Sequence, residues 1–262
     1  MKNNKKEIYA AHGIEFKNGR ILAPVFGWIA PLLVNGNAKL GEGIFTWSML
    51  PTNDTFTVEI DGKVYAIKGT CPCHCPGCYA TKGFYNMPST IKANAVKTIL
   101  ARDYLDFVAR AIAAQVEADK IEAVRIHASG DFFGDEYAAM WRKIAESFPA
   151  VKMWTYTKAR KYESLFDGLK NANIVKSVIP GSGFNFGHCD YILDTFAKLK
   201  KSGASVHICK CGFDKSQHCN KCKGCSENEY VLFVEHSTEY KAEKDAAFPA
   251  LREIVENQPV NA

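Results

Sequence analysis

The stretch Cys71-Pro-Cys-His-Cys-Pro-Gly-Cys78 decides how the rest of this chain is interpreted, because it holds four of the ten cysteines. If Cys73 is left aside, Cys71, Cys75 and Cys78 form a C-x3-C-x2-C spacing. One short loop of this kind can direct three thiolates at three corners of an iron–sulfur cube. The fourth iron would then stay open to another ligand.

The residues on either side predict a strand before this loop and a helix after it. Asp61-Gly62 is a two-residue hairpin signal, so residues 64–68 are expected to form a strand that leads directly to Cys71. Residues 91–118 carry apolar side chains at helical spacing. The loop is therefore expected at the carboxyl end of a strand, where ligands gather in α/β folds and where a helix N-terminus favours thiolates.

The same alternation continues to the end of the chain. Further strands are predicted at 123–127, 151–156, 174–179, 205–208 and 230–234, and further helices at 136–148, 162–169, 191–201 and 248–256. A series of right-handed βα units produces a parallel sheet, either open or curled. We therefore predict an α/β fold, a partial (βα)6 TIM-like barrel over residues 61–262. Residues 1–60 should form an irregular, β-containing N-terminal cap, and a cysteine-rich loop at 209–225 should precede the last strand.

Composition favours a cytoplasmic globular protein. The chain has 262 residues, a net charge of +5 and 47% hydrophobic residues, and no apolar run approaches the roughly 18 residues that a membrane helix needs. The basic residues 1–6 are followed by Glu7 and Ile8, and not by the apolar core of a signal peptide. In a reducing compartment, clustered cysteines are more readily metal ligands than disulfides.

Zinc is the alternative at the first cysteine group. Four thiols suffice for one zinc ion, but C-x-C-x-C-x2-C is cramped compared with the paired C-x2-C knuckles that usually bind it. The spacing therefore favours iron–sulfur. Cys73 is either a spectator or an additional ligand, and His74 is expected to be an exposed loop residue.

The cysteine loop resembles that of the radical S-adenosylmethionine (radical SAM) superfamily. The resemblance implies a [4Fe–4S] cluster whose open iron binds S-adenosylmethionine, which is cleaved reductively to a 5′-deoxyadenosyl radical. In that superfamily a Gly-Gly-Glu-like turn meets the methionine amino group, and Ser129, Gly130 and Asp131 are its partial counterpart. The alternative is structural: Gly130 permits a tight turn and Asp131 begins the cap of the next helix. His127 is a weak candidate that can equally be a packed histidine.

A second cysteine group lies near the C-terminus. Its members are Cys209, Cys211, Cys219, Cys222 and Cys225. The C-x2-C-x2-C run is typical of ferredoxin-like clusters, so an auxiliary iron–sulfur cluster is the leading interpretation. Zinc is the strong competitor, because C-x-C followed by C-x2-C is also a ribbon-like spacing and His218 adjoins Cys219. Cys189 stands apart and is expected to be a buried small hydrophobe.

Several further motifs together look like a phage and bacterial family named after a mycobacteriophage gene product. They extend over roughly residues 44–225 and include Thr46-Trp-Ser-Met-Leu-Pro51, Cys78-Tyr-Ala80, His127-Ala-Ser-Gly-Asp-Phe132 and Tyr156-Thr-Lys158. This resemblance implies no reaction. Thr157 and Lys158 are expected near the barrel mouth, where substrate could bind, and the equal alternative is that they form only a structural strand pair. The glycine-rich stretch 180–187 is either a ligand-wrapping loop or only a flexible one.

These observations lead to one leading function and two alternatives. The leading one is a radical SAM-like enzyme with a catalytic and an auxiliary [4Fe–4S] cluster, supplied with electrons by a ferredoxin or flavodoxin. The second is a non-catalytic iron–sulfur carrier or binding protein. The third is a zinc-stabilised nucleic-acid-binding protein, favoured by a lysine-rich patch between Lys198 and Lys223 that has one acid, Asp214. No membrane partner is expected.

Overall fold

The computed structural model describes residues 4–36, 40–75, 78–176, 186–210, 213, 218–234 and 242–258. The helices are α1 (Lys5–Ala11), α2 (Pro88–Asp103), α3 (Leu105–Ala118), α4 (Asp135–Ser147), α5 (Cys189–Lys201), α6 (Cys219–Cys222), α7 (Gly224–Glu227) and α8 (Phe248–Asn257). The strands are β1 (Phe16–Lys17), β2 (Arg20–Ala23), β3 (Gly27–Ile29), β4 (Val34–Asn35), β5 (Ile44–Ser48), β6 (Thr55–Ile60), β7 (Lys63–Lys68), β8 (Ala123–Ser129), β9 (Lys152–Thr157), β10 (Ala172–Lys176), β11 (Phe186–Gly187), β12 (Val206–Ile208) and β13 (Tyr230–Val234).

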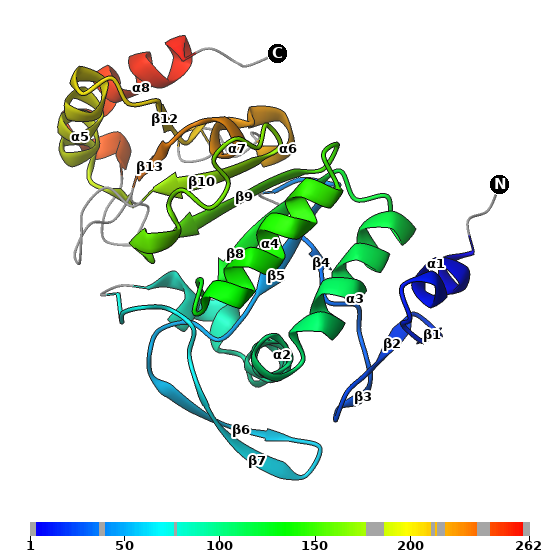
Figure 1. Ribbon diagram of the computed structural model, residues 1–262. Coiled ribbons are helices and arrows are strands. Elements are labelled where there is room, and N and C mark those ends of the chain that lie inside the picture. The colour runs from blue at the N-terminus through cyan, green and yellow to red at the C-terminus, as the bar shows by residue number, and fades with distance from the viewer. Residues whose placement is uncertain are drawn as a thin grey trace.

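The prediction of a partial (βα)6 barrel is wrong, because the described strands form several separate sheets (Figure 1). The largest is five-stranded in the order β10-β9-β8-β5-β4, with β4 antiparallel to β5 and the other neighbours parallel. A three-stranded parallel sheet has the order β11-β13-β12, and β1-β2-β3 and β6-β7 form small antiparallel sheets. A barrel needs one continuous ladder of strands, which these sheets do not provide.

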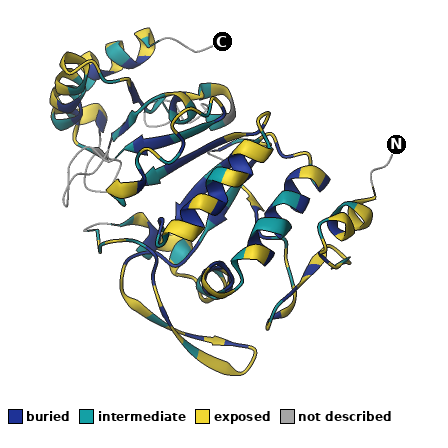
Figure 2. Cartoon of the chain, in the orientation of Figure 1, coloured by how far each residue is buried: buried dark blue, intermediate teal, exposed yellow. Residues whose placement is uncertain are grey.

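The first strand of the parallel series is β5, and not the predicted strand at 64–68. That predicted strand is β7, which pairs antiparallel with β6 from Thr55↔Lys68 to Ile60↔Lys63. The hairpin prediction is confirmed: Asp61 and Gly62 both have positive φ, 50° and 80°, as a two-residue turn of type I′ requires. The hairpin extends away from the main sheet and is largely exposed (Figure 2).

The helical predictions hold in part. Residues 136–148 and 191–201 correspond to α4 and α5, but the predicted helix 91–118 is divided at Tyr104 into α2 and α3. The described part of the predicted strand 174–179 falls in β10, which ends at Lys176.

Within the described residues, no helix combines the length and the apolar character needed to cross a bilayer.

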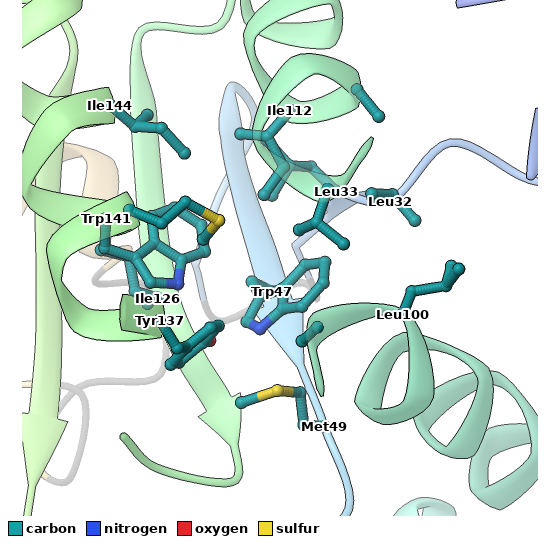
Figure 3. Close-up of a cluster of buried hydrophobic side chains, with 14 of the residues drawn as sticks. Leu32, Leu33, Trp47, Met49, Leu100, Ile112, Ile126, Tyr137, Trp141 and Ile144 are labelled. Carbon is teal, nitrogen blue, oxygen red and sulfur yellow. The ribbon is translucent and has the colours of Figure 1, made fainter. Parts of the chain in front are cut away.

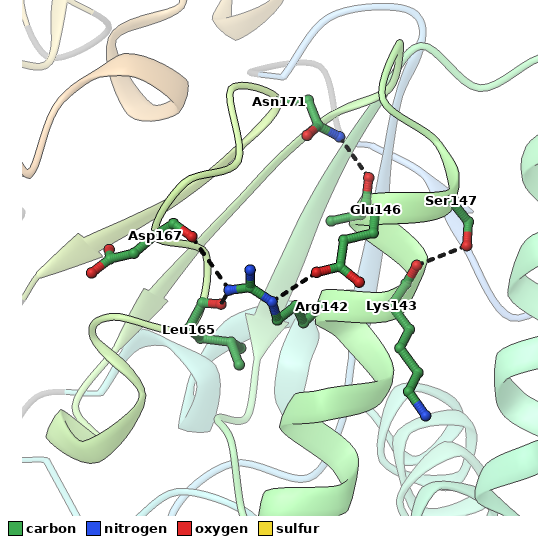
Figure 4. Close-up of polar contacts among 8 residues, drawn as sticks. Arg142, Lys143, Glu146, Ser147, Leu165, Asp167 and Asn171 are labelled. Atoms are coloured by element: carbon green, nitrogen blue, oxygen red, sulfur yellow. Dashed lines mark hydrogen bonds and ion pairs between the residues drawn. The ribbon is translucent and has the colours of Figure 1, made fainter.

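The predicted helix at 162–169 is absent, and a single turn of 3-10 helix, Arg160–Tyr162, leads into a series of turns. Figure 4 shows why: Arg142 on α4 donates from Nη1 to the carbonyl oxygens of Leu165 (2.6 Å) and Asp167 (3.4 Å). Asn171 donates to the carbonyl of Ala145 at 2.9 Å. In a helix over 162–169 the Leu165 carbonyl would accept from the N–H of Leu169, but here it accepts from Arg142, and Leu169 N donates to Phe166 O at 3.0 Å instead.

The main core lies between the five-stranded sheet and helices α2, α3 and α4. Trp47 of β5 and Trp141 of α4 are fully buried and meet edge to face, with ring centroids 6.0 Å apart (Figure 3). A second core joins α5 and α8 to strands β12 and β13. The two sheets meet where Lys176 N donates to Glu229 O at 2.7 Å. The division into 1–60 and 61–262 stays a prediction, although β4 and β5 of the first segment pair into the main sheet.

Candidate metal centres

The first cysteine group lies at the carboxyl end of β5. The chain leaves β5, forms the β6–β7 hairpin and then returns to the end of β5 at Thr70. Thr70 donates from its backbone N–H and its hydroxyl to Leu50 O, at 3.0 and 2.9 Å, and Cys71 N donates to Thr52 O at 2.9 Å. Gly69 is required for this close approach, because a Cβ there would lie 2.0 Å from Pro51 O. The cysteine loop therefore begins from a rigid base beside the main sheet.

The thiols of this group lie within electrostatic reach of one another. Burial raises the pKa of the Cys71 thiol well above its usual value, and Asp131, Cys78 and Cys75 raise it further. Burial likewise raises the pKa of Cys78, with Cys75 adding to the shift. The Sγ atoms of Cys73 and Cys75 are 3.6 Å apart. The raised pKa values keep the Cys71 and Cys78 thiols protonated at neutral pH, so ionising them would need a compensating positive charge.

Lys158 brings a positive charge to the same place. It follows β9, and its backbone N–H donates to Asp131 Oδ2 at 2.8 Å. Its ammonium group opposes the effect of burial on the pKa of Cys73 and Cys78. The expected barrel mouth does not exist, and Lys158 lies instead at the carboxyl end of β9 in an open sheet, near the first cysteine group. His74 is exposed, as predicted, and contacts Asp54 Oδ2 at 2.7 Å.

The turn Ser129-Gly130-Asp131 lies next to Cys71, but its side chains are engaged inside the protein. Ser129 Oγ donates to Met49 O at 2.8 Å. Asp131 accepts from Phe132 N and Thr157 Oγ1, both at 2.7 Å. Burial raises the pKa of Asp131 to about 6, against the lowering effect of its hydrogen-bond donors. The expectation that Asp131 caps the next helix is wrong, because Gly134 occupies the N-cap of α4.

His127 is a packed histidine. Its Nε2 lies 2.8 Å from Tyr137 Oη and its Nδ1 lies 3.1 Å from Thr155 Oγ1. Burial lowers its pKa to about 3, so the ring is neutral. His127 has φ +56° at a register shift between β5 and β8, which breaks the strand alternation that would place it on the face of Arg125.

A chain of polar contacts that sequence reasoning missed connects the two cysteine groups. Tyr79 Oη donates to Ala128 O at 2.6 Å, and Arg125 Nη2 donates to Tyr79 Oη at 3.3 Å. The Arg125 guanidinium lies 5.2 Å from the ring centroid of Tyr156, whose hydroxyl donates to Cys225 Sγ at 2.7 Å. Burial would lower the pKa of Arg125, but the tyrosines and Cys225 raise it, so the guanidinium stays charged. The only hint of this chain of contacts in the sequence was that Tyr79 directly follows Cys78.

The second cysteine group gathers where β12, α6 and α7 meet. Cys209 follows β12 and donates its N–H to Leu232 O at 2.8 Å. Cys222 Sγ lies 3.4 Å from Nε2 of His207, a residue that sequence reasoning also missed. Cys219 and Cys225 pack beside Trp154 and Tyr156. Cys211 and Asp214 lie outside the described residues, as do positions 180–185 of the glycine-rich stretch.

Two further findings concern the cysteines. Cys189 is fully buried in the second core, which confirms its predicted role as a small hydrophobe. Over the described part of the chain, no three or more His, Cys, Asp or Glu side chains already form a group that could hold a metal ion. An iron–sulfur cube spreads its cysteines over several irons, which separates them more than a single ion does.

Comparison with known proteins supports the phage-family resemblance. The profile of a family described as Gene product 88 matches residues 31–180. The Gene 88 protein of Mycobacterium phage D29 is 28% identical over an alignment of 160 positions, and the match covers 52% of this chain and 62% of that protein. The chain thus spans less than two thirds of the length of this relative. No radical SAM family matched, and no solved structure did. The chain therefore belongs to the Gene product 88 family.

Proposed function

We propose that this chain is an iron–sulfur protein of the radical SAM type, in which Cys71, Cys75 and Cys78 hold a [4Fe–4S] cluster. The observation that carries the proposal is the placement of these three cysteines on one loop, which hydrogen bonds of Thr70 and Cys71 anchor at the end of β5 beside Asp131. Their C-x3-C-x2-C spacing leaves one iron without a cysteine. When bound, such a cluster supplies the electron that cleaves S-adenosylmethionine.

The surrounding residues support such a site in distinct ways. Thr70 and Thr52 hold the start of the loop through backbone hydrogen bonds, so the position of Cys71 is fixed before any cluster is inserted. The Lys158 ammonium lowers the cost of keeping Cys73 and Cys78 as thiolates. Asp131 positions Lys158 by accepting its backbone N–H. The loop is thereby prepared for an anionic cluster.

One observation favours the alternative of a non-catalytic iron–sulfur carrier. The side chains of Ser129 and Asp131 are hydrogen-bonded within the fold. A cofactor at this turn would therefore have to contact its backbone. Both alternatives share the first cluster and differ in whether S-adenosylmethionine is cleaved.

Metal analysis tests the shared part of the proposal. Protein purified without oxygen should contain iron and acid-labile sulfide, and Cys75→Ala should lose the iron of the first site. Cys189→Ala is the matched control, since it also removes one thiol but lies in the second core. Wild-type protein that is colourless and holds zinc in place of iron would contradict both cluster alternatives.

Product analysis separates the enzyme from the carrier. Reduced, reconstituted protein should convert S-adenosylmethionine to 5′-deoxyadenosine above the level of Cys75→Ala. Cys73→Ala should keep both iron and product, because Cys73 is outside the C-x3-C-x2-C set. If the iron is present and no product forms, the carrier alternative replaces the enzyme.

An electron donor such as a ferredoxin or flavodoxin is the proposed partner. The lysines between Lys198 and Lys223 could steer such an acidic protein, or a nucleic acid, although Lys198 is already paired with Asp194 at 2.5 Å. Binding of either partner through this patch should weaken steeply as salt is raised. A salt titration with a flavodoxin and with duplex DNA therefore tests both.

A further inference from the structure

Arg125 places a positive charge on the main sheet, and no carboxylate of the described residues pairs with it. It lies in β8, the middle strand of that sheet, opposite Trp154 of β9. Val124 and Ile126 point into the main core. Strand alternation therefore places the Arg125 side chain on the other face of the sheet, away from α3 and α4. The charge is held on a face that the main core does not cover.

Most hydrogen-bond donors of this guanidinium are unused within the described part of the chain. An arginine carries five N–H donors and stays charged at physiological pH. One of them, on Nη2, has an acceptor, Tyr79 Oη, at 3.3 Å. Arg125 Nε is buried and has no hydrogen-bond partner among the described residues. A buried donor without an acceptor and a charge without a partner both cost stability, and a bound anion would remove both costs.

Three tyrosines lie near the guanidinium, and their hydroxyl protons are engaged elsewhere. Tyr79 and Tyr85 both donate to Ala128 O, at 2.6 and 3.2 Å. Tyr156 donates to Cys225 Sγ at 2.7 Å, and its ring centroid lies 5.2 Å from the guanidinium. Aromatic rings stabilise a cation without neutralising it. These contacts therefore hold the charge in place and leave it available to an anion.

The guanidinium is accessible to a small molecule. Tyr79 is 54% exposed, and Arg125 and Tyr156 are both partly exposed. Tyr79 directly follows Cys78, and Cys225 accepts the hydrogen bond of Tyr156. An anion bound to Arg125 would therefore lie between the two cysteine groups.

The single charge and its surroundings favour a carboxylate. The fork of Nε and Nη matches the two oxygens of a carboxylate, which carries one negative charge. A phosphate monoester carries nearly two charges, and one guanidinium would leave it partly uncompensated. The rings of Tyr79 and Tyr156 beside the charge suit an apolar or aromatic body.

We infer that Arg125 binds the carboxylate of a small apolar or aromatic monocarboxylic acid, with the rings of Tyr79 and Tyr156 beside its body. That this acid is the substrate rests on the proposed function, because the site adjoins the loop of Cys78. Binding of the carboxylate itself does not require a cluster. The inference thus names the chemical class of the molecule that the face between the two cysteine groups takes.

An NMR titration of the full-length wild-type protein tests the site without relying on the folding of a variant. Phenylacetate is the probe, and the readout is the Nε–H signal of Arg125, identified by its absence in Arg125→Lys. Phenylacetate should shift this signal in a saturable manner. Phenylacetamide keeps the ring and lacks the charge, so it should bind at least about tenfold more weakly. A signal that phenylacetate leaves unmoved, or equal binding of phenylacetamide, would overturn the inference.

Variants identify the cation, with binding followed by saturation transfer to the phenylacetate ring protons. Arg125→Gln removes the charge and should weaken binding by more than about tenfold, the effect of losing a hydrogen bond to a charged group. Arg125→Lys keeps the charge without the fork and should have an intermediate affinity. Arg252→Gln is the matched control, because Arg252 is exposed on α8 and already paired with Glu256 at 2.8 Å. Equal affinities of the two Gln variants would contradict the assignment.

A crossed comparison separates this inference from the proposed function. Cys75→Ala should lose iron and keep phenylacetate binding, whereas Arg125→Gln should keep the iron of the first site and lose the binding. Failure of the iron result concerns only the proposed cluster, and failure of the binding result concerns only Arg125. S-adenosylmethionine also carries a carboxylate and serves as the competitor. Its displacement of phenylacetate would overturn the assignment of the site to a separate acid.

Discussion

Thr70 Oγ1 accepts the backbone N–H of Asp131 at 3.1 Å and connects the residue before the cysteine loop to the turn after β8. The same hydroxyl donates to Leu50 O at 2.9 Å, so one side chain joins the ends of β5 and β8 to the loop. Thr70 is buried, which excludes water as a substitute partner. The position of the first cysteine group relative to Asp131 therefore depends on this hydroxyl.

Replacing Thr70 by valine should lower the free energy of unfolding by about 1–3 kcal/mol, because the buried N–H of Asp131 loses its acceptor. Valine keeps the shape of threonine, so packing changes little. Thr70→Ser keeps the hydroxyl and should lose less stability. Urea unfolding of the three proteins checks the order, and an unchanged midpoint for Thr70→Val would contradict the role assigned to the hydroxyl.

Gly130→Ala should destabilise the protein more than Gly203→Ala does. Both glycines have left-handed backbones, with φ +86° and +81°, so alanine costs about 1–2 kcal/mol at either position. Only at Gly130 would the new Cβ also meet side chains, at 2.6 Å from Thr70 Oγ1 and 3.1 Å from Met49 Cβ. Thermal unfolding of the two variants isolates the steric part, and equal losses would show that the turn can move aside.

Stability should decrease as pH falls below about 6.5, partly because of His127. Its pKa is about 3 in the folded protein and about 6.5 when unfolded, so the unfolded chain binds more protons between these values. The contribution is complete above pH 6.5, and about 2 kcal/mol of it is lost by pH 5.

Urea unfolding at several pH values, compared with His127→Asn, measures this contribution. Asparagine does not titrate in this range and tolerates the positive φ at position 127. The variant should have a flatter dependence on pH between 5 and 7. Parallel curves for the two proteins would contradict a buried neutral histidine.

Gln115→Leu should lower the free energy of unfolding by about 2–4 kcal/mol. The Gln115 side chain accepts from Leu33 N at 2.8 Å and donates to Leu33 O at 2.7 Å, so it attaches the segment before β4 to α3. Leucine fills a similar volume and leaves both buried backbone groups without these partners. Faster hydrogen exchange at the Leu33 amide would locate the loss, and unchanged exchange would contradict it.

Local features of the fold followed from the sequence where neighbouring residues decide the structure. The Asp61-Gly62 turn formed as predicted, because two residues with positive φ are sufficient to reverse a hairpin. Helix α4 (Asp135–Ser147) and strand β13 (Tyr230–Val234) formed close to the predicted ranges 136–148 and 230–234, because an amphipathic repeat and a short apolar run each favour one local structure. The break at Tyr104 was missed, because apolar spacing continues through it.

In the candidate sites, too, only features set by neighbouring residues could be predicted. Cysteine spacing predicted Cys71, Cys75 and Cys78 as one group, and the Ser129-Gly130-Asp131 turn was expected beside them. The roles of Thr70 and His207 were not visible, because each depends on a partner far along the chain. Spacing reveals ligands that lie within one loop, whereas a ligand or support from another strand appears only when the strands are aligned.

The sequence by itself determined the cysteine loop, the hairpin before it and the alternation of strands and helices after it, since these depend on residues a few positions apart. The tertiary structure decided that β5, and not β7, stands in the parallel sheet, that the strands divide into separate sheets, and that residues 162–169 form no helix. Strand pairing and the hydrogen bonds of Arg142 are long-range interactions. The stabilisation from these long-range contacts exceeds the intrinsic secondary-structure preference of the segments involved, and no pattern of neighbouring residues encodes it.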